Sequence, residues 1–374
     1  MNYINKFIDK LYLKYKESKD IKIHRKILII ESDDWGSIRV PSLDAYNKLI
    51  SLGYAMDKRP YERFDTLEND EDIEELFNVL LKHKDTNGNH PVITANMLMA
   101  NPDFNKIKGC NFTEYHYEKI DKTYNRYKNS DNVLSLMKKG IELGVFMPQS
   151  HGREHFNIKK WLDALKHNDK DVHTAFDYKM CGIFPKESPQ TGNKYLVALN
   201  NNNINEQEEI NLRITDGLQL FHEQWGFSST SFIAPCYCWN DAIEKTLHEN
   251  EVKIIQSGRI QKDSNINDKK YYRHCGERNK NGQIYTVRNA VFEPSTINNS
   301  NDVNKLLAQI DSIFKQRNIA IISSHRINYV SGISKLNREN KLKLLDKFLC
   351  EVIKRHPDIE FISTDKLTTI FTEP

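Results

Sequence analysis

Residues 26–36 read Lys-Ile-Leu-Ile-Ile-Glu-Ser-Asp-Asp-Trp-Gly, and this stretch decides the fold class. A short apolar run rich in β-branched residues predicts a buried strand, with Asp33 and Asp34 at its end. Because adjacent side chains of a strand point in different directions, one carboxylate can bind a cation while the other takes a proton from water. For an isolated Asp pair, capping of the following helix by Asp34 or Ser37 is the commoner explanation.

Seven later runs are also short, apolar and rich in β-branched residues. They alternate with segments in which apolar residues recur at helical spacing. The predicted strands are Ile27–Glu31, Val92–Asn96, Val145–Gln149, Ser231–Pro235, Val252–Gln256, Ile284–Arg288, Ile319–Ser323 and Ile359–Ser363. Apolar residues recur every three or four positions in Ile73–Lys82, in Val303–Lys315 and at Trp161, Leu162 and Leu165, which predicts covering helices. The alternation predicts an α/β fold with a parallel sheet or barrel, in which functional residues follow the strands.

The chain is long enough to bury a large core in one domain, with 374 residues and 39% hydrophobic content. We expect an amphipathic helix within residues 1–24 and a single barrel domain at 25–374. Stretches near 184–211 and 261–283 break the rhythm and predict insertions or long loops. In residues 1–20, apolar residues and lysines recur at helical spacing, so this helix either packs on the body or contacts an anionic membrane peripherally.

Composition argues against several classes of protein. The 54 Lys and Arg and 51 Asp and Glu residues leave a net charge of +3 without a basic stripe, which disfavours nucleic-acid binding. The six cysteines are irregularly spaced, which is typical of reduced thiols. Neither a signal peptide nor a transmembrane segment is recognisable, so we expect a cytoplasmic protein.

A His-x-x-x-His unit follows the third predicted strand, in Pro148-Gln149-Ser150-His151-Gly152-Arg153-Glu154-His155. On a helix, positions i and i+4 share one face, so His151 and His155 could bind one ion and Asp34 could complete a facial triad. The position of Glu154 differs from the H-E-x-x-H pattern of metalloproteases. A later histidine, His325, ends the strand in Ile319–Arg326 and has a pKa suited to protonating a leaving group.

In this order, the Asp33-Asp34 pair, the His151 and His155 unit, a strand end containing Pro235, and a late His325 resemble the polysaccharide deacetylase family of carbohydrate esterases. The resemblance spans about Ile27 to Leu367 and rests on the order and placement of short motifs. It implies a distorted (β/α) barrel of seven or eight mostly parallel strands.

The resemblance also implies the chemistry. Asp33 matches the family's catalytic base, while Asp34, His151 and His155 match its ligands to a divalent metal, commonly zinc although other transition metals fit. His325 matches the catalytic acid. The implied reaction removes N- or O-acetyl groups from sugars, with the cation stabilising the oxyanion.

Three departures from the family pattern mark a divergent member. The segment Phe232–Tyr237 keeps one proline but lacks the arginine that orients the base, for which Arg39, Arg153 and Arg326 are candidates by position. Gly152 stands where Ser or Thr is common. The family's tryptophan motif has no clear match near Val252–Gln261.

Several residues beside the motifs are candidates for substrate binding. Trp35, Tyr237, Trp239 and Tyr329 could stack on sugar rings, although core packing explains them equally well. Asn96 and Glu293 follow strands, where a turn or cap is the commoner role. The candidates for substrate binding are Trp35, Asn96, Arg153, Tyr237, Trp239 and Arg326.

The leading hypothesis is a cytoplasmic, metal-dependent deacetylase acting on an acetylated saccharide, with no nucleic-acid partner and no transmembrane segment. One alternative is a related barrel hydrolase acting on a glycosidic bond or a non-sugar amide. Another is a non-catalytic carbohydrate-binding protein. The sequence leaves the glycan, the metal and the oligomeric state open.

Overall fold

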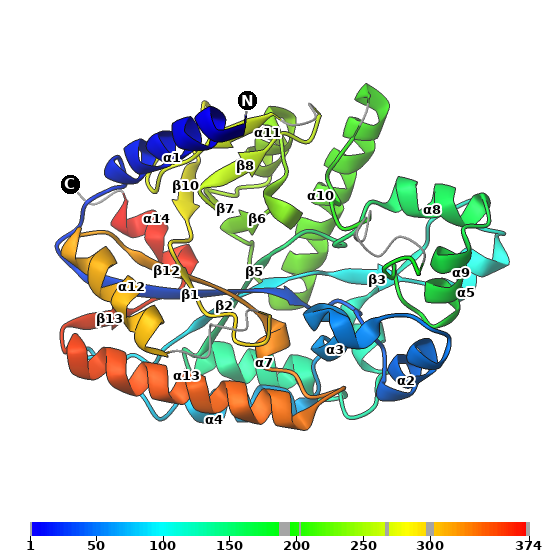
Figure 1. Cartoon of the computed structure of the whole chain (residues 1–374), viewed down its shortest axis with the longest axis horizontal. Helices are drawn as coiled ribbons and strands as arrows, with labels where there is room; N and C mark the ends of the chain where they lie inside the picture. The colour runs from blue at the N-terminus through cyan, green and yellow to red at the C-terminus, as the bar shows by residue number, and fades with distance from the viewer. Residues whose placement is uncertain (1, 187–194, 202, 266–268, 297–302, 372–374) are drawn as a thin grey trace.

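In the computed structural model, which describes residues 2–186, 195–201, 203–265, 269–296 and 303–371, one long strand lies at the centre of a parallel sheet (Figure 1). This strand, β1 (Lys26–Trp35), pairs in parallel with β2, β12 and β13. Residues Ile27–Ile30 are at most 1% exposed, because β1 is covered on both faces.

The described residues form a main sheet of nine strands, in the order β10-β7-β6-β5-β2-β1-β12-β11, with β13 pairing β1. Their bounds are β2 (Ile93–Met97), β5 (Phe146–Ser150), β6 (Ser231–Ile233), β7 (Ile254–Ser257), β10 (Ile284–Val287), β11 (Ala290–Val291), β12 (Ala320–His325) and β13 (Ile359–Phe361). All eight predicted strands are therefore confirmed, and β11 is an addition.

The two ends of this sheet are joined by one continuous segment. β10 pairs with β7, and β11, which follows directly along the chain, pairs with β12. At the junction, the Arg288 N–H donates to the Ser257 carbonyl and the Asn289 N–H donates to the Ile321 carbonyl. The fold is thus a distorted (β/α) barrel, as predicted. Arg288 lies in the segment between β10 and β11, which we call the barrel seam.

Helices cover the outside of the sheet. The pairs α12 with α13, α13 with α4, and α4 with α7 are in contact, and they form a continuous layer along the lower side of Figure 1. The core beneath this layer includes Ile30, Phe77, Phe146 and Phe348. The helix bounds are α1 (Asn2–Ser18), α2 (Leu43–Ser51), α3 (Pro60–Phe64), α4 (Asp70–Leu80), α5 (Phe104–Gly109), α6 (Ile120–Tyr124), α7 (Val133–Glu142), α8 (Ile158–Lys166), α9 (Lys170–Asp177), α10 (Ile204–Trp225), α11 (Asp241–Glu249), α12 (Val303–Lys315), α13 (Lys335–Arg355) and α14 (Leu367–Ile370).

The helical-spacing predictions correspond to α4, α12 and α8. Short 3₁₀ helices are η1 (Met56–Lys58), η3 (Pro235–Tyr237), η4 (Arg326–Asn328) and η5 (Thr364–Lys366), and two hairpins pair β3 (Ala100–Pro102) with β4 (Tyr117–Lys119) and β8 (Ile260–Lys262) with β9 (Lys270–Tyr272).

The two predicted insertions are only partly irregular. Residues 187–194 and 202 of the first lie outside the described residues, and its last eight residues, 204–211, already belong to α10. The second contains the β8–β9 hairpin, so it is not irregular throughout.

The N-terminal helix α1 packs against the same hairpin. The Tyr12 ring lies 5.0 Å from that of Tyr272, whose hydroxyl donates to Asp9, and Lys16 pairs with Glu277 at 3.0 Å. Peripheral membrane contact and the division at residue 24 stay predictions. Among the described helices, none is long and apolar enough to cross a membrane.

Candidate metal centre and active site

Asp33 and Asp34 lie at a bulge near the end of β1. The register between β1 and β2 shifts between Ser32 and Trp35, and Asp34 has a φ of 74°, in the left-handed region that few non-glycine residues occupy. The bulge turns the two neighbouring carboxylates to different partners. Neither Asp34 nor Ser37 caps α2, whose N-cap is Ser42, so the capping explanation was wrong.

His151 and His155 lie in the loop after β5, and the predicted helix is absent from this described segment. Gly152 has a φ of 98°, which breaks any helical path between them. The loop still brings the imidazoles together, with ring centroids 4.9 Å apart. It is anchored by the His151 N–H, which donates to the Met97 carbonyl at 2.8 Å.

Asp34, His151 and His155 form a three-residue cluster. Their candidate ligand atoms lie within 4.8 Å of one another, and Nε2 of each imidazole is 3.6 Å from Asp34 Oδ1. Asp34 comes from β1 and the histidines from the loop after β5, two strands that flank β2. The structure therefore brings together the three residues predicted as metal ligands.

The donor set fits a divalent cation. His151 Nδ1 donates to the Ile233 carbonyl at 2.9 Å, which leaves the lone pair on Nε2; this atom is buried and has no hydrogen-bond partner within the described residues. Burial lowers the pKa of His155 to about 4, so its ring is neutral near pH 7. Burial would raise the pKa of Asp34, but the two histidines hold it well below its usual value. One carboxylate and two imidazoles suit zinc and several other transition metals.

The arginine that holds Asp33 is Arg288, from the barrel seam. Its Nη1 and Nη2 donate to the two Asp33 oxygens at 2.7 and 2.6 Å, and its Nε donates to Glu31 at 2.7 Å. Burial would raise the pKa of Asp33, but Arg288 holds it below its usual value. Burial raises the pKa of Glu31, although Arg288 works against the shift.

The prediction that Arg39, Arg153 or Arg326 orients Asp33 was therefore wrong. Each is paired elsewhere: Arg39 lies 3.7 Å from Glu62, Arg153 binds Glu154 and Asp216, and Arg326 binds Asp65 and Glu68. The sequence carried one signal for Arg288, which is the last residue of a predicted strand and lies at the same edge of the sheet as Asp33. The family pattern directed attention to the strand before Pro235 instead.

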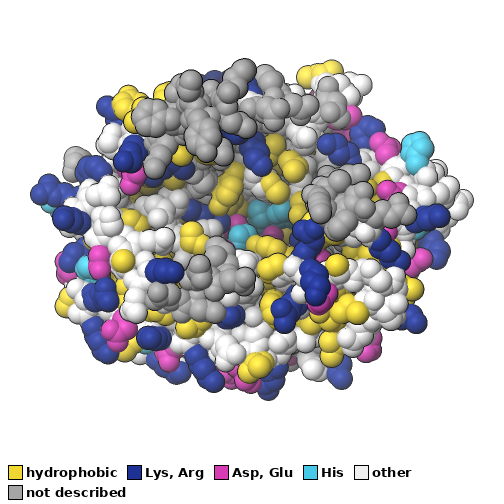
Figure 2. Space-filling model, in the orientation of Figure 1, with side chains coloured by type: hydrophobic (Ala, Val, Ile, Leu, Met, Phe, Trp, Pro, Cys, Tyr) yellow, Lys and Arg dark blue, Asp and Glu magenta, His cyan; other side chains and the backbone are white. Residues whose placement is uncertain are grey.

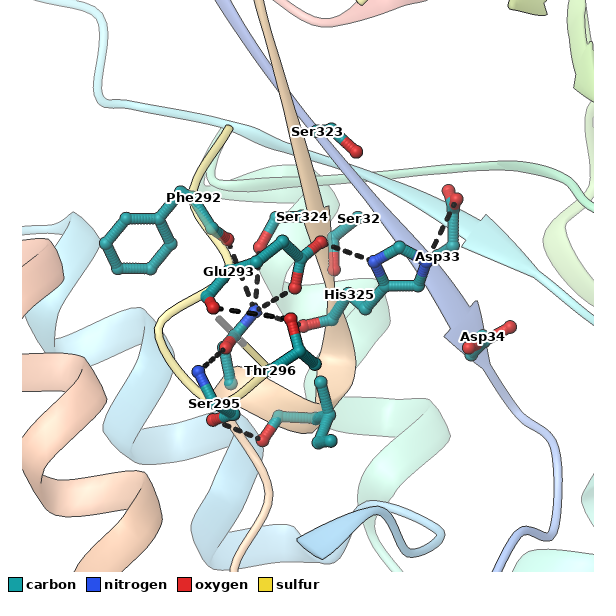
Figure 3. A network of polar contacts seen from close by, with 12 residues as sticks. Ser32, Asp33, Asp34, Phe292, Glu293, Ser295, Thr296, Ser323, Ser324 and His325 are labelled. Atoms are coloured by element: carbon teal, nitrogen blue, oxygen red, sulfur yellow. Dashed lines mark hydrogen bonds and ion pairs between the residues drawn. The ribbon is translucent and has the colours of Figure 1, made fainter. Parts of the chain in front are cut away.

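His325 lies opposite Asp33 in the parallel register of β1 and β12. Figure 3 shows its ring between two carboxylates, with Nδ1 at 2.5 Å from Glu293 and Nε2 at 3.7 Å from Asp33. Burial opposes it, but the Glu293 carboxylate and then Asp33 raise the pKa of His325 to about 10. The imidazolium is thus the form present near neutrality. Asn328 donates to the other Glu293 oxygen at 3.0 Å. The Glu293 side chain therefore contacts His325 and Asn328, which is not the turn or cap role that the sequence favoured.

Four of the predicted substrate-binding residues are buried. Trp35 stacks near Tyr329 and donates to Ser32, Trp239 donates to Glu244, Arg326 is enclosed by its carboxylates, and Asn96 donates to Asp33 and Gln256. A side chain without exposure cannot touch a substrate, so these four predictions were wrong. Asn96 instead contributes a further hydrogen bond to Asp33.

The remaining candidates are Arg153 and Tyr237. Arg153 lies outside the lining of the pocket above Asp33 and Asp34, whereas Tyr237 belongs to it. This pocket has a volume of about 470 Å³ and is lined by Asp33, Asp34, Arg39, Lys58, Arg59, Pro60, Tyr61, Glu62, His151, His155, Phe184, Leu196, Ile233, Ala234, Cys236, Tyr237 and His325. Figure 2 shows histidines in a hollow at the centre of this face, with cationic and apolar side chains around it.

No protein-family model matches this sequence, and no curated protein matches it. Among solved structures, the chain is similar to a 4-alpha-glucanotransferase from Thermococcus litoralis, with 11% identity, a TM-score of 0.46, and coverage of 94% of this chain and 41% of that one. It is also similar to the Xyl-CE4 domain of a multidomain xylanase from the hindgut metagenome of Trinervitermes trinervoides, with 9% identity, a TM-score of 0.39 and coverage of 92% and 91%. A CE4 family pseudoenzyme from Bacillus anthracis has 9% identity and a TM-score of 0.38, over 93% of this chain and 66% of that one. CE4 proteins are thus among the solved structures that resemble this chain, at identities too low to assign an activity.

Proposed function

We propose that this protein is a metal-dependent hydrolase that removes acetyl groups from an N- or O-acetylated sugar of a polysaccharide or its precursor. The main support is the convergence of Asp34, His151 and His155 within 4.8 Å, directly beside an ionised Asp33. A tri-ligand site with a neighbouring base and a separate acid is the arrangement that metal-assisted hydrolysis of an acyl group requires.

Each side chain has one role in this proposal. Asp33 takes a proton from the attacking water, and Arg288 and Asn96 keep the carboxylate ionised and fixed in direction. His325 donates the proton on Nε2 to the departing amine or alkoxide, and Glu293, which accepts a hydrogen bond from Nδ1, keeps the ring protonated. Asp34, His151 and His155 would hold the cation, which as a Lewis acid stabilises negative charge on the acyl oxygen.

Metal content and acetate release test this proposal together. Wild-type protein reconstituted with zinc is expected to bind one equivalent by elemental analysis, and His155→Ala or Asp34→Asn is expected to weaken binding by more than roughly 100-fold. His167→Ala is the matched control, since that exposed imidazole lies outside the cluster and contacts the Asp163 carbonyl. Full retention of metal by both cluster variants would refute the ligand assignment.

Acetate release from acetylated amino-sugar oligomers and O-acetylated xylan, assayed with and without a chelator, tests the reaction. Chelator-sensitive release supports deacetylation. Saccharide binding without acetate release from the metal-loaded protein would favour the non-catalytic carbohydrate-binding alternative, and cleavage of the oligomer would favour the glycosidic one. A cytoplasmic location remains part of the proposal.

A further inference from the structure

Tyr61 is a pocket-lining side chain that neither the acid-base chemistry nor the metal cluster uses. It is the second residue of α3 and lines the pocket together with Asp33, Asp34 and His325. Within the part of the chain that the structure describes, its hydroxyl has no hydrogen-bond partner. The neighbouring carboxylates differ in this respect, because Asp33 is bound by Arg288 and Asp34 faces the two histidines of the cluster.

Contacts with the rest of the protein fix the position of Tyr61. Its ring centroid lies 5.7 Å from that of His325, with the ring planes at 82°, and the Arg39 guanidinium lies 5.1 Å from the same centroid. The backbone is also anchored, because the Tyr61 carbonyl accepts from the Asp65 N–H at 3.0 Å and the Asp65 carboxylate accepts from Arg326. The side chain is therefore ordered before a substrate arrives, which lowers the entropic cost of binding.

The Tyr61 hydroxyl keeps its proton at neutral pH. A phenol in water ionises at about pH 10, and burial followed by the nearby Glu293 carboxylate raises the pKa of Tyr61 well above that value. The other tyrosine of the pocket, Tyr237, already accepts a hydrogen bond from Arg288 at 3.4 Å. The Tyr61 hydroxyl thus has a proton available for an oxygen atom of a ligand in this pocket.

We infer that Tyr61 is a substrate-binding residue, whose hydroxyl donates a hydrogen bond to a hydroxyl oxygen of the sugar that loses its acetyl group. The inference rests on the proposed function and specifies the leaving side of its substrate. In that function His325 protonates the sugar atom that leaves, so the sugar lies against His325, and Tyr61 contacts this same ring. A sugar carries hydroxyl groups beside its acylated atom, whereas a simple non-sugar amide offers no such oxygen.

The first test measures steady-state kinetics of Tyr61→Phe, which keeps the ring and removes the hydroxyl. With the zinc-loaded protein and acetylated amino-sugar oligomers, we expect KM to rise by roughly tenfold, kcat to change by less than about twofold, and the pH profile to stay unchanged. Hydrolysis of p-nitrophenyl acetate, which lacks sugar hydroxyls, should be unaffected. Tyr127→Phe is the matched control, since Tyr127 packs on the main core and lies outside the pocket lining.

The second test measures binding without turnover. Calorimetric titration of the zinc-loaded protein uses the deacetylated oligomers, which keep their hydroxyl groups and have no acetyl group to lose. Tyr61→Phe should weaken the Kd by roughly tenfold relative to the wild-type protein, and Tyr127→Phe should leave it unchanged. A residue that acts only by positioning His325 would not change this Kd.

Three results would overturn the inference. They are an unchanged KM and Kd in Tyr61→Phe, a fall in kcat at constant KM, and an absence of oligomer binding by the wild-type protein. If acetate is released equally well by Tyr61→Phe, the inference fails and the proposed reaction stands. If no sugar releases acetate but Tyr61→Phe still weakens oligomer binding, the proposed reaction fails and the contact with the sugar stands.

Discussion

Both terminal nitrogens of Arg288 donate hydrogen bonds to Asp33, a residue 255 positions away in the sequence. The same guanidinium donates from Nε to Glu31, which lies on the same strand two residues earlier. One buried cation therefore serves two buried carboxylates. Because Arg288 lies in the segment that connects β10 with β11, the strands at the two ends of the sheet order, the geometry of the proposed base depends on that connection.

Replacing Arg288 by Lys should lower kcat/KM for deacetylation by roughly 100-fold, because a point charge cannot hold both Asp33 oxygens and a small misplacement of a catalytic group has a large effect. Arg153→Lys is the matched control: it removes a similar two-carboxylate contact, with Glu154 and Asp216, away from Asp33. Steady-state kinetics of both variants checks the prediction. Similar losses in the two variants would contradict a specific role for Arg288.

Arg288→Ala should mainly affect folding. It leaves Asp33 and Glu31 buried without their cation, which is expected to lower the free energy of unfolding by about 3–5 kcal/mol near neutral pH. Both carboxylates would then bind protons more readily, so the loss should be smaller at pH 4 than at pH 7. Urea denaturation at the two pH values measures this difference, and an equal loss at both would argue against unpaired charge as its cause.

The turn after Trp35, which follows Asp33 and Asp34 in the chain, requires a glycine at position 36. Gly36 has a φ of 83°, and a Cβ atom placed on it would lie 2.5 Å from the Leu98 carbonyl oxygen. Gly36→Ala should therefore combine a conformational penalty of about 1–2 kcal/mol with an overpacking penalty of about 1–3 kcal/mol. Gly53 has a φ of 89° and open space where a Cβ would lie, so Gly53→Ala should show the first penalty alone. Equal free energies of unfolding for the two variants would show that the Leu98 contact is relieved at no cost.

The strands were predictable because their signal is local. Strands of a parallel sheet are buried on both faces and appear as short apolar runs, as in Ile27–Ile30, whatever they pair with. The order of β1, β5 and β12 around the barrel then brings the residues at their ends together. For this reason Asp34, His151, His155 and His325 could be identified as a group from the sequence alone.

What could not be predicted depends on contacts between distant segments. Arg288 ends a predicted strand and was in that sense a candidate, but its pairing with Asp33 depends on how residues 284–291 connect the two ends of the sheet, and no local pattern encodes that register. Spacing of i and i+4 suggested a helix for His151 and His155, whereas the positive φ of Gly152 makes a loop that serves equally well. Trp35 follows the motif in sequence, yet the bulge at Asp34 directs its side chain into the core.

Glu293 offers a test of the proposed acid through its pH dependence. With Glu293 beside it, His325 has a pKa of about 10, so the proton donor is present at neutral pH and kcat/KM should fall only as the pH rises through about 10. Glu293→Gln removes the negative charge and keeps the side-chain shape, so the pKa of His325 should fall toward its ordinary value of about 6.5. The fall of kcat/KM at basic pH should therefore begin at lower pH. At pH 8, kcat/KM should decrease by up to roughly 30-fold, and much of the activity should return near pH 6.

Glu360→Gln, which alters a surface pair with Arg25, is the control and should leave the pH profile unchanged. A uniform loss of activity at every pH would mean that Glu293 positions the ring without setting its protonation, and an unchanged profile would remove His325 from the role of acid.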